Sequence, residues 1–423
     1  MRSFPLVTTL LAVGFTGALL LGAWALLTLR GPVLRSASFS LEAISPNADG
    51  DKDITAIRYA LARPATVSIH FLDAAGNRYT FRHLKPRESG EHEVLFSGIV
   101  DPFTHPEDEF SDQVLARLLP DGQYTWVVEA YVEGKVSEKV SGILTVSQAE
   151  ARLPAIRNLS ASPSPFSPNQ DGIDDRASVT LWLDEEVPPE SGLRVTLIAE
   201  DGQEYPIAEQ ASATLPGRAG LHTFDYDGGI DLGQEPPPDG VYIVRAEAED
   251  ATGQKMRAAT LLTIVNGGLP RAEILNGEVR FSKASVLLGE TLYFTLTIDN
   301  YGTAPIRTSG PWPGTAYQQD ENANTIGFFE QDGAWRVGID CDSCIRDYPW
   351  RWAVGRPEDL VQINGQWYLP PGGRAVVTGG VVLKEVIPAR NPQYFWAGLI
   401  HEAVEVSAIN NRVDPFSVTI VSP

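Results

Sequence analysis

Two short loops of the sequence gather oxygen-bearing side chains at a spacing that suits a hard cation. In the first loop, alternate positions around Gly50 carry these oxygens, namely Asn47, Asp49, Asp51 and Asp53. Ca²⁺ binds six to eight oxygens from carboxylates, amides, backbone carbonyls and water. The spacing therefore predicts one structural Ca²⁺ in each loop. The alternative is a turn without metal, since turns favour Asn, Asp and Gly in any case.

The same motif returns near the middle of the chain as part of a longer repeat. The second loop carries its oxygens around Gly172, on Asn169, Asp171, Asp174 and Asp175. Further pairs follow in the same order along the chain: 67–72 with 194–199, Gly76 with Gly202, Tyr79 with Tyr205, and 120–124 with 238–242. Ordered matches at a nearly constant offset predict a duplicated domain.

Each copy has the pattern of short strands separated by turns. Residues 54–61 and 66–71 alternate between apolar and polar, and residues 124–132 are rich in Val, Tyr and Trp. Asp-Gly and Pro-Asp-Gly sequences punctuate these runs, and no segment of the body keeps a helical period. The pattern predicts an all-β chain with a sandwich of about a hundred residues per copy. Residues 151–166, with three prolines, are expected to form a hinge between the copies.

Both copies resemble the immunoglobulin-like (Ig-like) domain first described in the flagellar hook-cap protein. The marks of that domain are an opening Ser-Pro-Asn-x-Asp-Gly and a closing Asp-Gly-x-Tyr strand, which both copies keep, and a central Asp-x-x-Gly hairpin, which the first copy keeps at 73–76. A further mark, Phe-x-x-Asp-Gly, is kept at 224–228 and altered at 94–98. The opening motif is also similar to C-terminal sorting domains of gliding bacteria, but these copies are internal. The resemblance implies an Ig-like fold over residues 38–267 and no specific activity.

The pattern changes from about residue 277 and predicts a third domain. A Gly289-Glu290-x-Leu opening and an Asn300-x-Gly-Thr turn make it similar to bacterial adhesion-related Ig-like domains, with a closing strand at 416–421. Residues 310–370 form a long insertion that such domains usually lack. The predicted architecture is an anchor segment at 1–35 followed by three β-sandwich (Ig-like) domains, at 36–150, 151–267 and 268–423.

Tryptophans concentrate in this third domain, which holds six of the nine. Trp350 and Trp352 alternate along an expected strand, so they share one face of it. With Trp367 they are predicted to form a platform that stacks on a sugar ring or anchors a partner protein. The alternative is that these rings fill the core of the sandwich.

The two cysteines, Cys341 and Cys344, are the only ones in the chain. A zinc site would need two more ligands at metal spacing, and no Cys or His pair lies nearby. In an oxidising compartment, a local disulfide is therefore the prediction.

The N-terminal segment has no charge between Arg2 and Arg30. The apolar run over residues 4–29 is long enough for a helix that spans a bilayer. It predicts an uncleaved single-pass anchor in the cell membrane, with the body outside the cytoplasm. The alternative is a signal peptide cleaved after the small residues at 23–25, which would give a secreted protein.

The formal net charge is −21, from 54 acidic and 33 basic residues. Nucleic acid is excluded as a partner, because neutralising phosphates requires clustered Lys and Arg. Catalytic motifs such as Gly-x-Ser-x-Gly and His-Glu-x-x-His are missing from the sequence, so the protein is not predicted to be an enzyme. His401, Glu402 and Glu405 lie near the tryptophans and are expected to be solvated strand positions rather than a glycosidase pair.

Three functions remain open from the sequence. The first is a membrane-anchored scaffold or adhesion-type protein whose third domain meets a protein or surface glycan. The second is a carbohydrate- or cell-wall-binding module, and the third is an extracellular hydrolase hidden in the third domain. Exposed coplanar tryptophans would favour the second, and a deep cleft with two facing carboxylates would favour the third.

Overall fold

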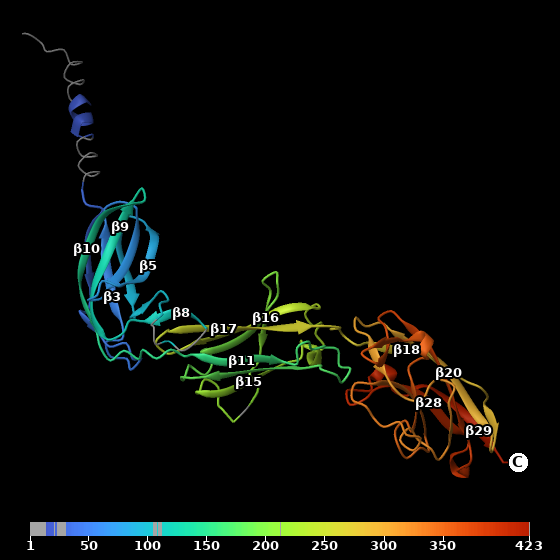
Figure 1. Ribbon diagram of the computed structural model, residues 1–423. Coiled ribbons are helices and arrows are strands. Elements are labelled where there is room, and N and C mark those ends of the chain that lie inside the picture. The colour runs from blue at the N-terminus through green and yellow to red at the C-terminus, as the bar shows by residue number, and fades with distance from the viewer. Residues whose placement is uncertain are drawn as a thin grey trace, which may run out of the picture.

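Three β-sandwiches follow one another in series (Figure 1). The computed structural model describes residues 14–20, 22, 31–104, 108, 112–211 and 213–422. Strands make up the body in this part of the chain. The helices there, apart from helical residues 14–20 and 22, are single 3₁₀ turns: η1 (Ile230–Leu232), η2 (Pro357–Asp359), η3 (Pro388–Arg390) and η4 (Ala408–Asn410). The prediction of an all-β chain is confirmed.

The first sandwich packs a three-stranded sheet, β1–β3–β6, on a five-stranded sheet, β2–β10–β9–β4–β5. The strands are β1 (Leu34–Phe39), β2 (Ala43–Ile44), β3 (Thr55–Leu61), β4 (Ala65–Leu72), β5 (Arg78–Arg87), β6 (Gly90–Phe96), β9 (Gly122–Val132) and β10 (Lys135–Val146). Alternate residues of these strands, among them Ile57, Ile69 and Phe71, are buried between the sheets in one apolar core.

The second sandwich repeats this arrangement, with sheets β11–β12–β15 and β14–β13–β16–β17. The strands are β11 (Ile156–Ser162), β12 (Ala177–Leu183), β13 (Leu193–Ile198), β14 (Glu204–Ile207), β15 (Gly220–Tyr226), β16 (Gly240–Glu249) and β17 (Lys255–Ile264). Two strands of the first repeat, β7 (Ile99–Val100) and β8 (Gln113–Leu118), extend the larger sheet beyond β17. The boundary predicted near residue 150 therefore does not separate the two sandwiches in space.

The third sandwich packs the sheet β18–β20–β27–β22 on an eight-stranded sheet. The strands of the first sheet are β18 (Ala272–Phe281), β20 (Thr291–Asn300), β22 (Ala316–Gln318) and β27 (Arg374–Val382). Those of the second are β19 (Ser285–Leu287), β21 (Ile306–Thr308), β23 (Trp335–Cys341), β24 (Trp350–Ala353), β25 (Val361–Ile363), β26 (Gln366–Leu369), β28 (Gln393–His401) and β29 (Val413–Val421). The insertion predicted at 310–370 thus contributes strands to both sheets.

The first junction, between the first and second sandwiches, is rigidly bonded rather than hinged. Gln254 is 0% exposed and donates from Nε2 to the carbonyl oxygens of Glu150 and Arg152, at 2.9 and 2.8 Å. Its Oε1 accepts the backbone N–H of Leu118, the last residue of β8. The hinge predicted at 151–166 is wrong, because strand β8 and this buried amide tie the linker to both sandwiches.

The predicted anchor at residues 4–29 lies mostly outside the described residues. Residues 14–20 and 22, which are described, are helical. Within the described part of the chain, no helix combines the length and the apolar character that a membrane crossing needs.

Candidate functional site

The first Asp-rich loop is a network of hydrogen bonds from its own backbone. Both carboxylate oxygens of Asp53 accept N–H groups, Oδ1 from Asn47 and Ala48 and Oδ2 from Gly50 at 2.7 Å. Asn47 Oδ1 accepts the N–H of Asp49, and Asp49 Oδ1 in turn accepts the N–H of Asp51. These are the bonds of Asx turns, and the loop is largely exposed to solvent.

The second Asp-rich loop repeats the same bonds in a different environment. Asp175 accepts from the backbone of Asp171 and Gly172, and Asn169 Oδ1 accepts the N–H of Asp171. Asn169 and Asp171 are only 2% and 3% exposed, because the third sandwich covers this loop. Asp174, like Asp51 in the first loop, is exposed.

The geometry of the two loops does not fit a calcium site. Among the described residues, no three His, Cys, Asp or Glu side chains come together in a way that could hold a metal ion. The oxygens of Asp53 and Asp175 face backbone N–H groups instead of a common centre. The metal-free turn, the alternative weighed from the sequence, accounts for these contacts.

Chelation of calcium is therefore expected to leave the thermal unfolding midpoint of the chain unchanged. The loop carboxylates already have hydrogen-bond donors, so a cation would have to displace them before binding. Differential scanning calorimetry in chelator and in millimolar calcium measures this. A midpoint that rises with calcium, and no longer rises after Asp49→Ala and Asp171→Ala, would restore the calcium prediction.

The second junction, between the second and third sandwiches, is built around this covered loop. The Tyr368 hydroxyl donates to Asp171 Oδ2 at 2.7 Å, and His401 Nε2 donates to the backbone carbonyl of Gln170 at 2.7 Å. The His401 ring stacks on Trp335, with ring centroids 4.4 Å apart. Gly172 approaches the third sandwich so closely that a Cβ atom there would collide with the carbonyl oxygen of Asp332.

Burial at the second junction shifts the pKa values of its titratable groups. Burial, with the nearby Asp171 carboxylate, raises the pKa of Asp175 to about 6. Its counterpart in the uncovered first loop, Asp53, has a lowered pKa, chiefly through the hydrogen bond from Gly50. Burial also lowers the pKa of His401 to about 4, and the Arg307 guanidinium lowers it further. Covering the loop therefore favours a protonated carboxyl and a neutral imidazole.

These two shifts predict opposite pH effects that largely cancel in the intact chain. The pKa of Asp175 in the docked junction is about 6, above its ordinary value of 3.8, so lowering the pH from 6 towards 3.8 favours the docked junction. The His401 pKa falls from 6.5 to about 4, so the docked junction is favoured above 6.5 and loses stability as the pH falls towards 4. We expect His401→Gln to tighten the junction at pH 5 relative to pH 7, and Asp175→Asn to loosen it.

Spin labels at two exposed positions, Ser191→Cys and Ser285→Cys, report this opening as an interdomain distance distribution. The parent chain, which keeps both groups, is the control. Identical pH responses of the His401→Gln and Asp175→Asn chains would contradict the assigned roles.

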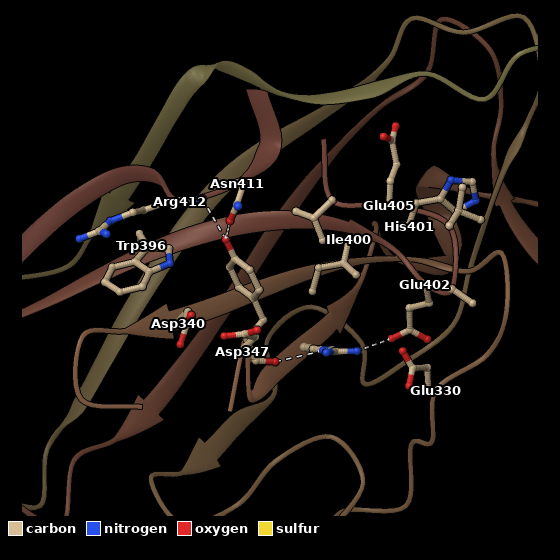
Figure 2. Close-up of a pocket in the computed structure, with 15 residues that line it drawn as sticks. Glu330, Asp340, Asp347, Trp396, Ile400, His401, Glu402, Glu405, Asn411 and Arg412 are labelled. Atoms are coloured by element: carbon tan, nitrogen blue, oxygen red, sulfur yellow. Dashed lines mark hydrogen bonds and ion pairs between the residues drawn. The ribbon is translucent and has the colours of Figure 1, made fainter. Parts of the chain in front are cut away.

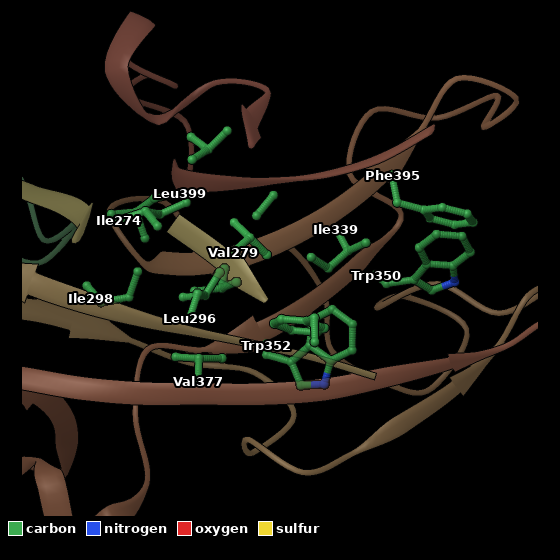
Figure 3. Close-up of a cluster of buried hydrophobic side chains, with 14 of the residues drawn as sticks. Ile274, Val279, Leu296, Ile298, Ile339, Trp350, Trp352, Val377, Phe395 and Leu399 are labelled. Atoms are coloured by element: carbon green, nitrogen blue, oxygen red, sulfur yellow. The ribbon is translucent and has the colours of Figure 1, made fainter. Parts of the chain in front are cut away.

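The predicted tryptophan platform is wrong for Trp350 and Trp352. They are 2% and 0% exposed and lie within the core of the third sandwich, where Figure 3 shows Trp350 beside Phe395. Trp352 packs edge-on against Phe294 and donates from Nε1 to the carbonyl of Thr315. Large aromatic side chains fill a sandwich core effectively, and this explains why both rings are buried and not exposed.

The third member of the predicted platform, Trp367, is partly buried against the same core. Its ring meets Trp312 edge-on at 6.0 Å, and Trp312 is 38% exposed. Cys341 and Cys344, at the end of β23, are joined by a disulfide with Cα atoms 5.1 Å apart. The bridge lies at the end of β23, next to Asp340, which lines a groove.

This groove has a volume of about 610 Å³ and lies on the outer face of β23 and β28. Its floor is Tyr348, whose ring rests on the backbone where two glycines, Gly338 and Gly398, pair across the strands. A Cβ atom on either glycine would collide with the ring. The Tyr348 hydroxyl donates to Asn411 Oδ1 at 2.6 Å and accepts the N–H of Arg412.

Acidic side chains dominate the lining of the groove, with five carboxylates against two guanidinium groups. Figure 2 shows Arg412 beside Trp396 at one end, where its guanidinium lies 4.5 Å above the ring. The carboxylates are Glu330, Asp340, Asp347, Glu402 and Glu405. Burial raises the pKa of Asp340 on the groove floor.

Glu402 and His401 are buried, which corrects their prediction as solvated strand positions. Glu402 is 1% exposed and pairs with Arg336 and Arg351 at 3.1 and 2.9 Å. Its second oxygen accepts the N–H of Gln331. Glu405 is exposed, as predicted. Of the groove residues, only His401, Glu402 and Glu405 were singled out from the sequence. Gly338 and Gly398, which make room for the Tyr348 ring, are the feature of the sequence that could have indicated the position of the groove.

No family model matches the chain, and no curated protein matches it. Among solved structures, it is similar to a Ca²⁺-stabilized adhesin that helps an Antarctic bacterium bind ice, at 15% identity over 93% of this chain and 74% of that one, with a TM-score of 0.24. A two-domain fibronectin type III segment of chicken tenascin shows 12% identity over 54% of this chain and 98% of that one, with a TM-score of 0.17.

A third solved structure, a DUF4785 family protein from Legionella pneumophila, shows 8% identity over 90% of this chain and 84% of that one, with a TM-score of 0.22. An adhesin and fibronectin domains are thus among the neighbours, but these values assign no family or function. The resemblances to the hook-cap and adhesion-related domains stay predictions.

Proposed function

We propose that this protein is a membrane-anchored, extracytoplasmic binding arm of the scaffold or adhesion type, and that it is not an enzyme. The first two sandwiches space the third away from the anchor, and the groove on the third meets the partner. The Cys341–Cys344 disulfide supports an oxidising compartment for the body. The anchor itself rests on the uncharged run over residues 4–29.

The observation that carries the proposal is the acidic groove over β23 and β28. Exposed carboxylates on Glu330, Asp347 and Glu405 ring a hollow of about 610 Å³ whose floor is aromatic. Such a field attracts cationic groups and repels anionic ones. We therefore propose a basic polypeptide segment as the partner.

A surface glycan receives less support from the same groove. Sugar rings stack on open aromatic faces, and here Arg412 covers Trp396 while Tyr348 is only 6% exposed. The hydrolase alternative also receives less support, because Glu402, although it lines the groove, is only 1% exposed and is held between two arginines. Glycan binding remains an outcome that the following experiment distinguishes.

Removing two groove charges, Asp347→Asn with Glu405→Gln, is expected to weaken binding of a lysine-rich peptide about two- to thirtyfold. Each exposed ion pair contributes about 0.2–1 kcal/mol, so two charges together give an effect of this size. Isothermal titration of the full chain with tetralysine measures it, and added salt should weaken binding further. The matched control, Glu358→Gln with Glu385→Gln, removes exposed charges of the same domain that do not line the groove.

If the chain does not bind the peptide but binds a chitin or cellulose oligosaccharide, this result would favour the carbohydrate-binding alternative. Equal loss in the groove and control variants would show that net charge, and not the groove, attracts the peptide.

A further inference from the structure

The groove and the second junction share one tight turn of the third sandwich. The turn follows β28 and is closed by hydrogen bonds in both directions between His401 and Glu405, at 2.9 and 3.0 Å. Ala403 and Val404, at its tip, line the groove on one side and a second hollow of about 430 Å³ at the junction on the other. A change on either side therefore acts on the same five residues.

At the groove side, the turn is held by the buried carboxylate of Glu402. Arg351, which lines the groove, pairs with Glu402 Oε1 at 2.9 Å. Glu402 also bonds through its backbone to the neighbouring segment, accepting from Gly333 N–H at 2.8 Å and donating to the Ala334 carbonyl at 2.9 Å. A group that draws Arg351 towards the groove would weaken its ion pair with Glu402 and so act directly on this turn.

At the junction side, the same two segments contact the second sandwich. His401, the first residue of the turn, donates to the Gln170 carbonyl. Asp332 and Gly333 lie against the backbone of Asp171 and Gly172. Arg351 in the groove is thus linked to the loop of the second sandwich through its ion pair with Glu402, the peptide bond from Glu402 to His401, and the hydrogen bond of His401 to Gln170.

We propose that the 401–405 turn couples the groove to the second junction, so that occupying the groove changes how firmly the second and third sandwiches dock. The two states are the docked and undocked junction. Coupling between two sites is reciprocal, so opening the junction must also loosen the groove. This gives a test that needs no ligand, and its result is independent of whether the groove binds a basic polypeptide.

Gly172→Ala opens the junction from the side of the second sandwich, because the added Cβ collides with the Asp332 carbonyl. Gly50→Ala is its matched control. Gly50 occupies the same place in the first loop, with φ +91° against +82°, and an added Cβ there has open space. Both variants carry the same backbone strain, and only one of them disturbs the junction.

Hydrogen exchange of the full chain, read by mass spectrometry, tests the coupling. We expect backbone amides of residues 331–334 and 401–405 to exchange at least tenfold faster in the Gly172→Ala chain and at the parent rate in the Gly50→Ala chain. Unchanged exchange at 401–405 in Gly172→Ala overturns the proposal, whether or not the sandwiches separate.

The reverse direction is tested by Arg351→Gln, which removes the groove-side partner of Glu402 and keeps the buried Arg336 pair. The distance distribution between spin labels at Ser191→Cys and Ser285→Cys is expected to broaden. A distribution that stays as narrow as that of the parent chain contradicts the coupling. As a control, Arg356→Gln removes a third-sandwich arginine that does not line the groove and should leave it unchanged.

Discussion

Glu402→Leu is expected to destabilise the third sandwich by about 3–5 kcal/mol, because it leaves a buried charge without its partner. Arg336 is 1% exposed and keeps only carbonyl partners, those of Ser309 and Phe329, once the carboxylate is gone. Arg351 is less affected, since its side chain is 22% exposed and reaches water. Denaturant unfolding, followed by tryptophan fluorescence, measures the loss.

A second variant decides whether the ion pair or the packing is responsible. Replacing both partners, Arg336→Met with Glu402→Leu, should recover most of the lost stability, because a buried pair exchanged for apolar groups is often neutral. Equal destabilisation of the single and double variants would show that the site depends on shape and not on charge.

Gln254→Ala is expected to cost about 2–4 kcal/mol, since each buried polar group left unpaired costs about 1–3 kcal/mol. The substitution strands the carbonyls of Glu150 and Arg152 and the N–H of Leu118. It also removes the side-chain bond to the end of β8, which then contacts the second sandwich through its pairing with β17. We expect the first two sandwiches to unfold together in the parent chain and in separate transitions in the Gln254→Ala chain.

Calorimetry resolves the two transitions, and Gln123→Ala, an exposed position in β9, serves as the control. A single transition with unchanged midpoint in the Gln254→Ala chain would refute the role assigned to the first junction.

Local motifs allowed much of the two repeated sandwiches to be predicted. The Pro-Asp-Gly-x-Tyr segments form the same corner twice, with Tyr124 and Tyr242 donating to the carbonyls of Pro120 and Pro238. Asp121 and Asp239 each accept two backbone N–H groups from the segment just after the hairpin that follows, β9–β10 and β16–β17. Such bonds connect residues close in sequence or in adjacent strands, so the residue types alone carry the information.

Contacts between distant segments could not be predicted in this way. The pairing of β8 with β17 and the burial of Asp171 depend on which sandwich lies next to which. The prediction for Trp350 and Trp352 was wrong for the same reason. Period-two alternation places both rings on one face of a strand but does not show which face is buried. Glu402 was misjudged for a related reason, since its two arginine partners lie at 336 and 351.

Strand β8 has a consequence for the order in which the chain acquires its structure. Synthesis proceeds from the N-terminus, so residues 113–118 emerge well before residues 255–264, which form their partner β17. Until then β8 presents unpaired N–H and C=O groups, the kind of edge that recruits strands from other nascent chains. During synthesis the first repeat therefore has an unpaired strand. Only when the second repeat has been made and β17 pairs with β8 is this edge protected from aggregation.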